Sequence, residues 1–205
     1  MNDKGPGGNI AFVHLAFILD EPLIALFFLL LQQGVRVRRR VGCSVEAFLR
    51  QELEVGPEAL DKIQSIMLDG KPVDDIGSAL IHDGSVLALS AAMPGLVGAT
   101  LRRGGAYSSL RNAITYHEDG KAVLSGEGWV GVKLFNLMMA ELGPGLLRHG
   151  VLVHGADLTD LLAKGPQEIR KVCTVTLEGK PVELGMLEGI AALQGNNLVL
   201  LTVNV

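Results

Sequence analysis

The stretch LDGKPVDD, residues 68–75, returns near the other end of the chain as LEGKPVEL, residues 177–184. In both copies an acidic residue and Gly form a pair that favours a tight turn with positive φ, and Pro follows two residues later. Pro cannot donate a ladder hydrogen bond, so it is tolerated only in a turn or at a sheet edge. The phrase therefore predicts, twice, a short strand that leaves a tight turn, and turn geometry explains the repetition without catalysis.

The segments around the phrase also recur in one order. An apolar helix, a strand, an amphipathic helix, the phrase and a final strand are predicted in each half of the chain. Five matching elements in one order favour an internal duplication over coincidence. The matched segments are 23–33 with 132–142, 35–38 with 151–154, 45–49 with 158–162, 68–75 with 177–184, and 84–92 with 195–203.

Local signals place the ends of several elements. A buried strand is predicted from Ile10 to Leu19, followed by a helix from about Glu21 to Gln33 that Gly34 closes. The alternation in VRVRRRV, residues 35–41, indicates a strand with one wet face, which accounts for its arginines. Ser44 is the expected N-cap of the amphipathic helix in the first half, and Asp157 that of its counterpart.

The fold expected from these signals is α+β, with two tandem units. A disordered tail is predicted for residues 1–9, a first unit for 10–93, a connector rich in Gly and Arg for 94–112, and a second unit for 113–205. Residues 113–125 are expected to form a hairpin around Asp119-Gly120, which supplies the second unit with a counterpart of the first strand.

The order strand, helix, IQSIMLDGKPVDD (63–75) and ALIHDGSVLALSAAMPG (79–95) resembles the ubiquitin-like β-grasp sulfur carriers of molybdopterin and thiamine synthesis. The resemblance covers residues 35–92 and, more weakly, 151–205, and it implies a β-grasp-like fold for each unit, with an extra N-terminal helix. It does not imply sulfur transfer, because the carriers use a free C-terminal Gly-Gly and this sequence ends in LLTVNV. The stretch ALSAAMPGLVGATLRRGG, residues 88–105, also resembles a bacterial protein family, and that likeness implies no activity.

Composition limits the kinds of partner. The formal charge of −4 gives no overall attraction for the phosphates of nucleic acid, so no nucleic-acid partner is expected. Cys43 and Cys173 are too few for a disulfide scaffold, which favours reduced, structural thiols and a cytoplasmic location. Membrane association through the apolar runs and the arginines that follow them stays an alternative, but Asp20 and Pro22 interrupt the runs.

The connector contains the best candidate binding site. Its glycines and arginines, with a neighbouring tyrosine, suit a phosphate or carboxylate held by backbone N–H groups and guanidiniums. A flexible loop with solvated charges is the simpler interpretation, because the spacing matches no nucleotide-binding motif. The candidate residues are Gly95, Gly98, Arg102, Arg103, Gly104, Gly105, Tyr107 and Arg111.

No catalytic residue, metal site or cofactor is predicted. The serines miss the nucleophile-elbow pattern, and the histidines lack metal-ligand spacing. We therefore expect a non-catalytic adaptor that acts through a protein partner or as a homodimer. An enzyme or small-molecule-binding protein with its site at the connector is the alternative. The histidines are His14, His82, His117, His149 and His154.

Overall fold

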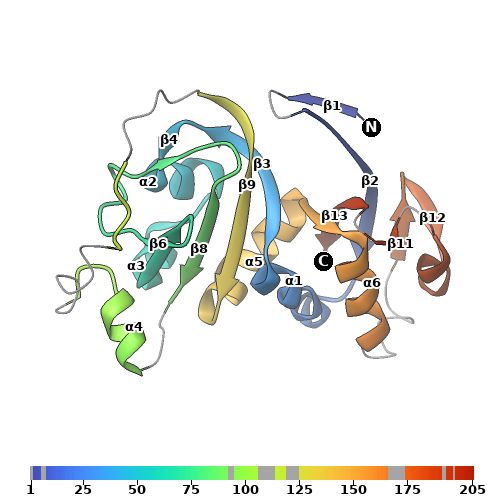
Figure 1. Ribbon diagram of the computed structural model, residues 1–205. Helices are drawn as coiled ribbons and strands as arrows, with labels where there is room; N and C mark the ends of the chain where they lie inside the picture. The colour runs from blue at the N-terminus through green and yellow to red at the C-terminus, as the bar shows by residue number, and fades with distance from the viewer. Residues whose placement is uncertain are drawn as a thin grey trace. The chain divides into compact units, whose positions relative to one another are not determined.

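The computed structural model describes residues 2–5, 8–91, 95–105, 114–118, 125–165, 174–190, 193–195 and 197–205 (Figure 1). The chain divides into two compact units. Unit 1 consists of Met1–Arg36 together with Gly143–Val205, and unit 2 consists of Val37–Leu142. Unit 2 is thus one continuous segment, whereas unit 1 is assembled from both ends of the chain.

Unit 1 is built on a mixed sheet with the strand order β12-β11-β2-β13-β10. The central strands β2 and β13 run parallel, whereas β11 pairs antiparallel with β2 and β10 pairs antiparallel with β13. The strands are β2 (Gly8–Ile18), β10 (Val151–His154), β11 (Thr174–Leu177), β12 (Lys180–Val182) and β13 (Leu198–Asn204), with β1 (Asn2–Gly5) antiparallel to β2.

Helices complete the core of unit 1. Phe17 on β2 and Phe27 on η1 are both fully buried, and their rings meet edge to face with centroids 5.2 Å apart. Pro22 lies in the first turn of η1, and Gly34 ends α1 with a φ of 118° that disfavours other residues. The helices are η1 (Glu21–Phe27), α1 (Phe28–Gln33), α6 (Gly155–Lys164), η4 (Leu184–Gly189) and the last part of α5 (Leu137–His149).

Unit 2 contains a mixed sheet with the strand order β3-β9-β8-β5-β6. Here β8 and β9 are parallel, whereas β5 pairs antiparallel with β8 and β6 pairs antiparallel with β5. The strands are β3 (Val35–Val41), β5 (Ser65–Leu68), β6 (Lys71–Pro72), β8 (Val86–Ser90) and β9 (Gly126–Phe135); β4 (Cys43–Ser44) and β7 (Leu80–Ile81) form a separate pair.

The core of unit 2 lies on one face of this sheet. Alternate residues of β5, β8 and β9 are fully buried, as are Phe48 and Leu49 of the helical segment that follows β4. That segment begins as predicted, because the Ser44 side chain accepts a hydrogen bond from the backbone N–H of Ala47. The helices are α2 (Val45–Ala47), the π-helical η2 (Phe48–Glu52), α3 (Pro57–Lys62), α4 (Gly95–Leu101) and the first part of α5.

The repeated phrase forms the same hairpin in both units. Asp69 and Glu178 have φ of 51° and 50°, and the glycines that follow them have φ of 78° and 76°. Such left-handed pairs suit the two-residue turns of hairpins. The register is also identical. Pro72 faces Met67, the third residue of β5, and Pro181 faces Thr176, the third residue of β11. The predicted turn is confirmed in both copies.

The long strand of the second half corrects one prediction. Residues 132–142 were expected to form a helix, but Val132–Phe135 belong to β9 and the helix begins only at Leu137. The burial pattern explains the difference, because Val130, Val132 and Leu134 are buried and their neighbours are less so, which is a period of two. The apolar residues of 132–135 are compatible with a helical period of 3.6 as well, but in the sheet they follow the strand period of two.

The bounds of the two compact units differ from those predicted from the sequence, which were residues 10–93 and 113–205. The reason is that β2 pairs with strands of the second half, whereas β9 pairs with β8 of the first half. Residues 2–5, expected in a tail, form β1, and residues 95–101 of the expected connector form α4.

Several other predictions can be compared with the structure. The helical region from Glu21 to Gln33 and the strands at 35–41 and 151–154 are confirmed. Asp157 lies in the first turn of α6, and the N-cap is His154. The mixed helices and strands confirm the α+β class. Within the described part of the chain, no helix has both the length and the apolarity needed to cross a bilayer.

Candidate functional site

Four of the candidate residues at the connector, 102–105, form the turn that follows α4. Arg102 donates a side-chain hydrogen bond to Oε1 of Gln64, and the backbone N–H of Arg103 donates to the carbonyl of Gln64 over 2.8 Å. Gly104 has a φ of 62°, and the N–H of Gly105 donates to the carbonyl of Arg102. Both arginines are thus attached to the residue that precedes β5.

The other candidates of that group fall partly inside and partly outside the described residues. Gly95 and Gly98 lie within α4. Tyr107 and Arg111 lie outside the described residues, as does the predicted hairpin turn at Asp119-Gly120. The described part of the connector is therefore a helix and a turn.

A different region of unit 2 contains the more organised polar cluster, at the β6 edge of the sheet. The backbone N–H of Tyr116 donates to the carbonyl of Pro72 over 2.8 Å. Residues 114–118 therefore run beside this edge, and we call them the strap. Pro72 and Val73 are buried. A sheet edge that would otherwise present an unpaired carbonyl is covered here.

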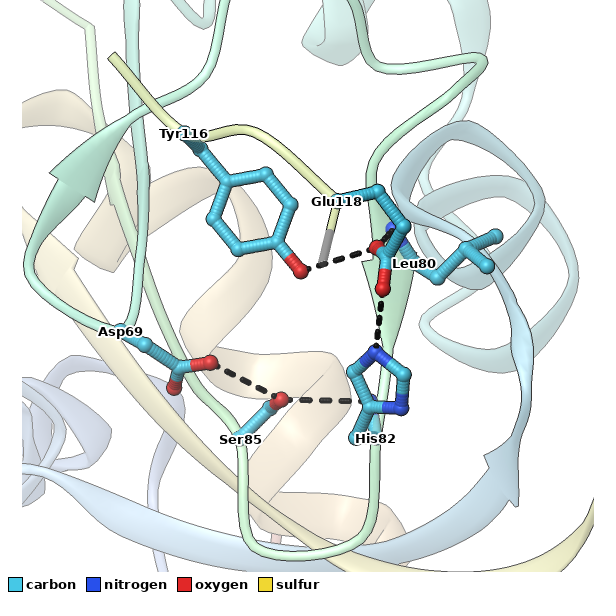
Figure 2. Close-up of polar contacts among 6 residues, drawn as sticks. All are labelled: Asp69, Leu80, His82, Ser85, Tyr116 and Glu118. Atoms are coloured by element: carbon cyan, nitrogen blue, oxygen red, sulfur yellow. Dashed lines mark hydrogen bonds and ion pairs between the residues drawn. The ribbon is translucent and has the colours of Figure 1, made fainter. Parts of the chain in front are cut away.

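Glu118 fixes the strap to two residues outside it and contacts Tyr116 within it (Figure 2). Its Oε2 accepts hydrogen bonds from the hydroxyl of Tyr116 at 3.0 Å and the backbone N–H of Leu80 at 3.3 Å. Its Oε1 lies 3.1 Å from Nε2 of His82, an ion pair when the imidazole is protonated. One carboxylate thus connects the strap to β7 and to the loop after it.

The same contacts decide the ionisation of Glu118. Burial acts to raise the pKa of this carboxyl, but the hydrogen bonds from Tyr116, His82 and the Leu80 backbone outweigh burial and hold the pKa below its ordinary value. The carboxylate is therefore charged at neutral pH.

A second set of contacts supports the turn beneath the strap (Figure 2). The hydroxyl of Ser85 donates to Oδ2 of Asp69 and accepts the backbone N–H of His82, both at 3.2 Å. Oδ1 of Asp69 accepts the N–H of Val86 over 2.7 Å. A serine nucleophile needs a hydrogen bond to a side-chain base, whereas Ser85 contacts His82 through its backbone. This geometry stabilises a turn.

Unit 1 repeats part of this arrangement. Oε1 of Glu178 accepts the N–H of His14 over 2.7 Å, and the N–H of Glu178 donates to the carbonyl of His14. Asp69 makes the matching pair of contacts with Val86 in unit 2. The acidic residue of each phrase therefore holds the neighbouring strand, and β2 occupies in unit 1 the position that β8 occupies in unit 2.

The outer edge of this hairpin differs between the units. Pro181, the counterpart of the buried Pro72, is exposed, and Val182 is only partly buried. Among the described residues, no donor contacts the carbonyl of Pro181. A cavity of about 420 Å³ lies beside this edge, lined by residues that include Thr174, Pro181 and Leu184. Among the described residues, the hairpin edge of unit 1 is thus uncovered, whereas that of unit 2 is covered by the strap.

Residues considered for metal binding or thiol chemistry are dispersed. The described residues contain no cluster of three or more potential metal ligands. Nε2 of His14 lies 3.1 Å from the hydroxyl of Thr202, and Nδ1 of His149 lies 2.9 Å from the carbonyl of Gly145. Burial, followed by the charge of Glu52, raises the pKa of the Cys43 thiol. Cys173 lies outside the described residues.

Sequence reasoning missed the contacts of Tyr116 and Glu118, because no local motif links the strap to β6. The one available signal was the repeated phrase, which identified the edge itself. No protein-family model, curated protein or solved structure matches this chain.

Proposed function

We propose that the protein is a non-catalytic adaptor that binds an extended segment of a protein partner along the β12 edge of unit 1. The observation that carries the proposal is the contrast between two edges with the same sequence phrase and register. One is covered by the strap, and the other, as far as the described residues show, is uncovered and lies beside a cavity.

Strand order supports the β-grasp-like reading of unit 2. Its sheet has a central parallel pair, β8 and β9, with an antiparallel hairpin, β5 and β6, at one edge. Unit 1 has the same pattern, with β2 and β13 at the centre and β11 and β12 at the edge. Together with the repeated order of elements, these patterns favour duplication of one β-grasp-like unit.

The binding mode is addition of a strand to the sheet. Pro181 faces Thr176 across the hairpin, as Pro72 faces Met67 in unit 2. In unit 2 the carbonyl of Pro72 accepts a hydrogen bond from the backbone N–H of Tyr116 in the strap. The carbonyl of Pro181 is available in the same way to a backbone N–H of the partner. Backbone bonds of this kind supply affinity, and alternate side chains entering the neighbouring cavity supply specificity.

The strap provides the natural probe. A fluorescent peptide with the sequence of residues 114–118, Ile-Thr-Tyr-His-Glu, is titrated against the full-length protein, and amide shifts are mapped by NMR. The largest shifts are expected at Val182 and Glu183. Val182→Glu places a charge at the cavity wall and is expected to weaken binding by at least about tenfold.

Val205→Glu is the matched control, because Val205 is exposed and does not line the cavity. It is expected to leave binding unchanged. Equal binding to the wild-type protein and the Val182→Glu variant, or shifts confined to unit 2, would refute the proposal.

A further inference from the structure

Unit 2 contains a second cavity, of about 390 Å³, on the face of its sheet. Its floor is formed by side chains from β5, β8 and β9 that lie in register. Ser65 faces Ser90, and Met67 faces Ala88. On the parallel side, Ala88 and Ser90 are aligned with Lys133 and Phe135. These residues share one face because alternate residues of paired strands point the same way.

Side-chain size explains why this face is hollow. The three central positions, Ser65, Ala88 and Ser90, carry small side chains, whereas Met67 and Phe135 form larger walls. The residues between them in sequence point to the opposite face and fill the core, where they are fully buried. The cavity is thus fixed by the sheet itself, and its volume lies within the roughly 300–1,000 Å³ typical of small-ligand sites.

One charged side chain lies in this mostly apolar lining. Lys133 is partly buried, and among the described residues it has no ion-pair or hydrogen-bond partner. Nearby, Nδ2 of Asn136 donates to the hydroxyl of Ser90 over 3.2 Å, which adds a polar end to the cavity. A lysine at the wall of an apolar cavity, with no carboxylate partner among the described residues, suits an anionic ligand whose charge it can pair.

The corresponding face of unit 1 lacks these features. Thr202 takes the position of Lys133, since it faces Ala16 as Lys133 faces Ala88, and its hydroxyl contacts His14. Ile18 takes the position of Ser90 and is 55% exposed. The combination of small central residues and a lysine therefore belongs to unit 2 and does not follow from the shared fold.

We infer that this cavity binds a small amphipathic carboxylate, with its apolar body against Met67, Ala88 and Phe135 and its charge paired with Lys133. The site is separate from the β12 edge, and the inference does not depend on the proposed adaptor function. The apolar lining excludes a strongly hydrated anion, and Lys133 selects against a neutral molecule of the same shape.

The test uses full-length protein and isothermal titration calorimetry with decanoate, decanol and acetate. Decanoate is expected to bind at least about tenfold more tightly than either of the others. Lys133→Met is expected to remove this preference for decanoate over decanol and to leave the binding of decanol unchanged. Lys71→Met, a lysine on β6 that does not line the cavity, is the matched control.

A second variant tests the floor. Ala88→Leu fills the centre of the cavity and is expected to weaken decanoate and decanol by similar factors. Urea unfolding shows whether each variant remains folded, and if Ala88→Leu does not, the Lys133→Met comparison decides alone. The inference is overturned if decanoate fails to bind the wild-type protein at millimolar concentration, or if Lys133→Met and Lys71→Met bind it equally.

Discussion

Units 1 and 2 share a hairpin and differ in how the chain supplies the strands beside it. In unit 2 the strand next to the hairpin is β8, which follows it closely in sequence. In unit 1 the same position is taken by β2, from the opposite end of the chain. The two units therefore show that turn and hairpin geometry follow the local sequence, whereas the identity of the neighbouring strand does not.

The difference extends to the surfaces. The strap covers the hairpin edge of unit 2, whereas no segment of the described part of unit 1 bonds to the equivalent edge. Conversely, the face of unit 2 carries a cavity with Lys133 where unit 1 has Thr202. Two sheets with the same strand pattern but different surface features are consistent with two different binding roles in one chain.

The largest effect is expected from separating the units. A fragment of residues 37–142 contains the sheet positions of unit 2 and is expected to unfold cooperatively in urea. A fragment of residues 143–205 lacks β2, which lies between β11 and β13, and is expected to remain unfolded until a peptide of residues 1–36 is added. Circular dichroism measures both. Cooperative folding of 143–205 alone would contradict the strand order of unit 1.

Truncation of equivalent core side chains is expected to have the next largest effect. Phe17 on β2 and Leu89 on β8 hold matching positions and are fully buried. Phe17→Ala is expected to cost about 3–5 kcal/mol and Leu89→Ala about 2–5 kcal/mol of folding free energy.

The location of each loss is measurable, because Trp129, the single tryptophan, lies in unit 2. Only Leu89→Ala is expected to move the urea midpoint of Trp fluorescence, whereas Phe17→Ala is expected to move part of the circular dichroism transition. A fluorescence midpoint that shifts equally in both variants would show that the units do not unfold separately.

The acidic residues of the two phrases provide a smaller, paired test. Asp69→Ala and Glu178→Ala each leave a backbone N–H without its carboxylate and, because both contacts are exposed to solvent, are each expected to cost about 0.5–1.5 kcal/mol. The loss is expected to be greater for Asp69, which also accepts the Ser85 hydroxyl. Asp69→Asn is the control for backbone strain, since Asn tolerates the left-handed conformation and keeps an acceptor. If Asp69→Ala costs no more folding free energy than Asp69→Asn, the hydrogen bonds of the Asp69 carboxylate contribute little to stability.

The smallest effect concerns the pH dependence of the strap. Because the folded-state pKa of Glu118 is lowered, its stabilisation is present above the ordinary pKa and is lost as pH falls through the lowered value. Glu118→Gln is expected to reduce stability at pH 7 by less than about 1 kcal/mol, because the pair with His82 is partly exposed. Fluorescence-monitored unfolding at a series of pH values from 7 down to 3 measures this, and a difference that does not shrink as the pH falls would contradict the assignment.

The sequence was most informative where the structure is local. The turn at Asp69-Gly70, the cap at Ser44 and the strand at 35–41 depend on neighbouring residues and were predicted correctly. The C-terminal part of β9 was predicted as a helix, because Val132 and Leu134 fit an apolar helix as readily as a strand. Only the alternation of buried and less buried residues along the whole of β9 distinguishes the two.

The site was less accessible. Arg102 and Arg103 were predicted as anion-binding residues from the composition of the connector. Their contact with Gln64 could not be predicted in this way, because it joins residues almost forty positions apart. The strap and the cavity depend on strand register, which a single sequence does not specify. Lys133 in particular acquires its surroundings only when β8 and β9 align in parallel.

The position of β2 has a consequence for biosynthesis. Its sequence GNIAFVHLAFI leaves the ribosome long before the two long-range strands that flank it in the sheet, β11 and β13. Unit 2 can complete its sheet in the meantime, but most of this apolar strand, beyond the residues that pair with β1, lacks its native partners until β11 and β13 have been made. Nascent chains are therefore expected to be most vulnerable to aggregation through this strand, and the late insertion of β2 between two newly made strands is expected to limit the rate of maturation.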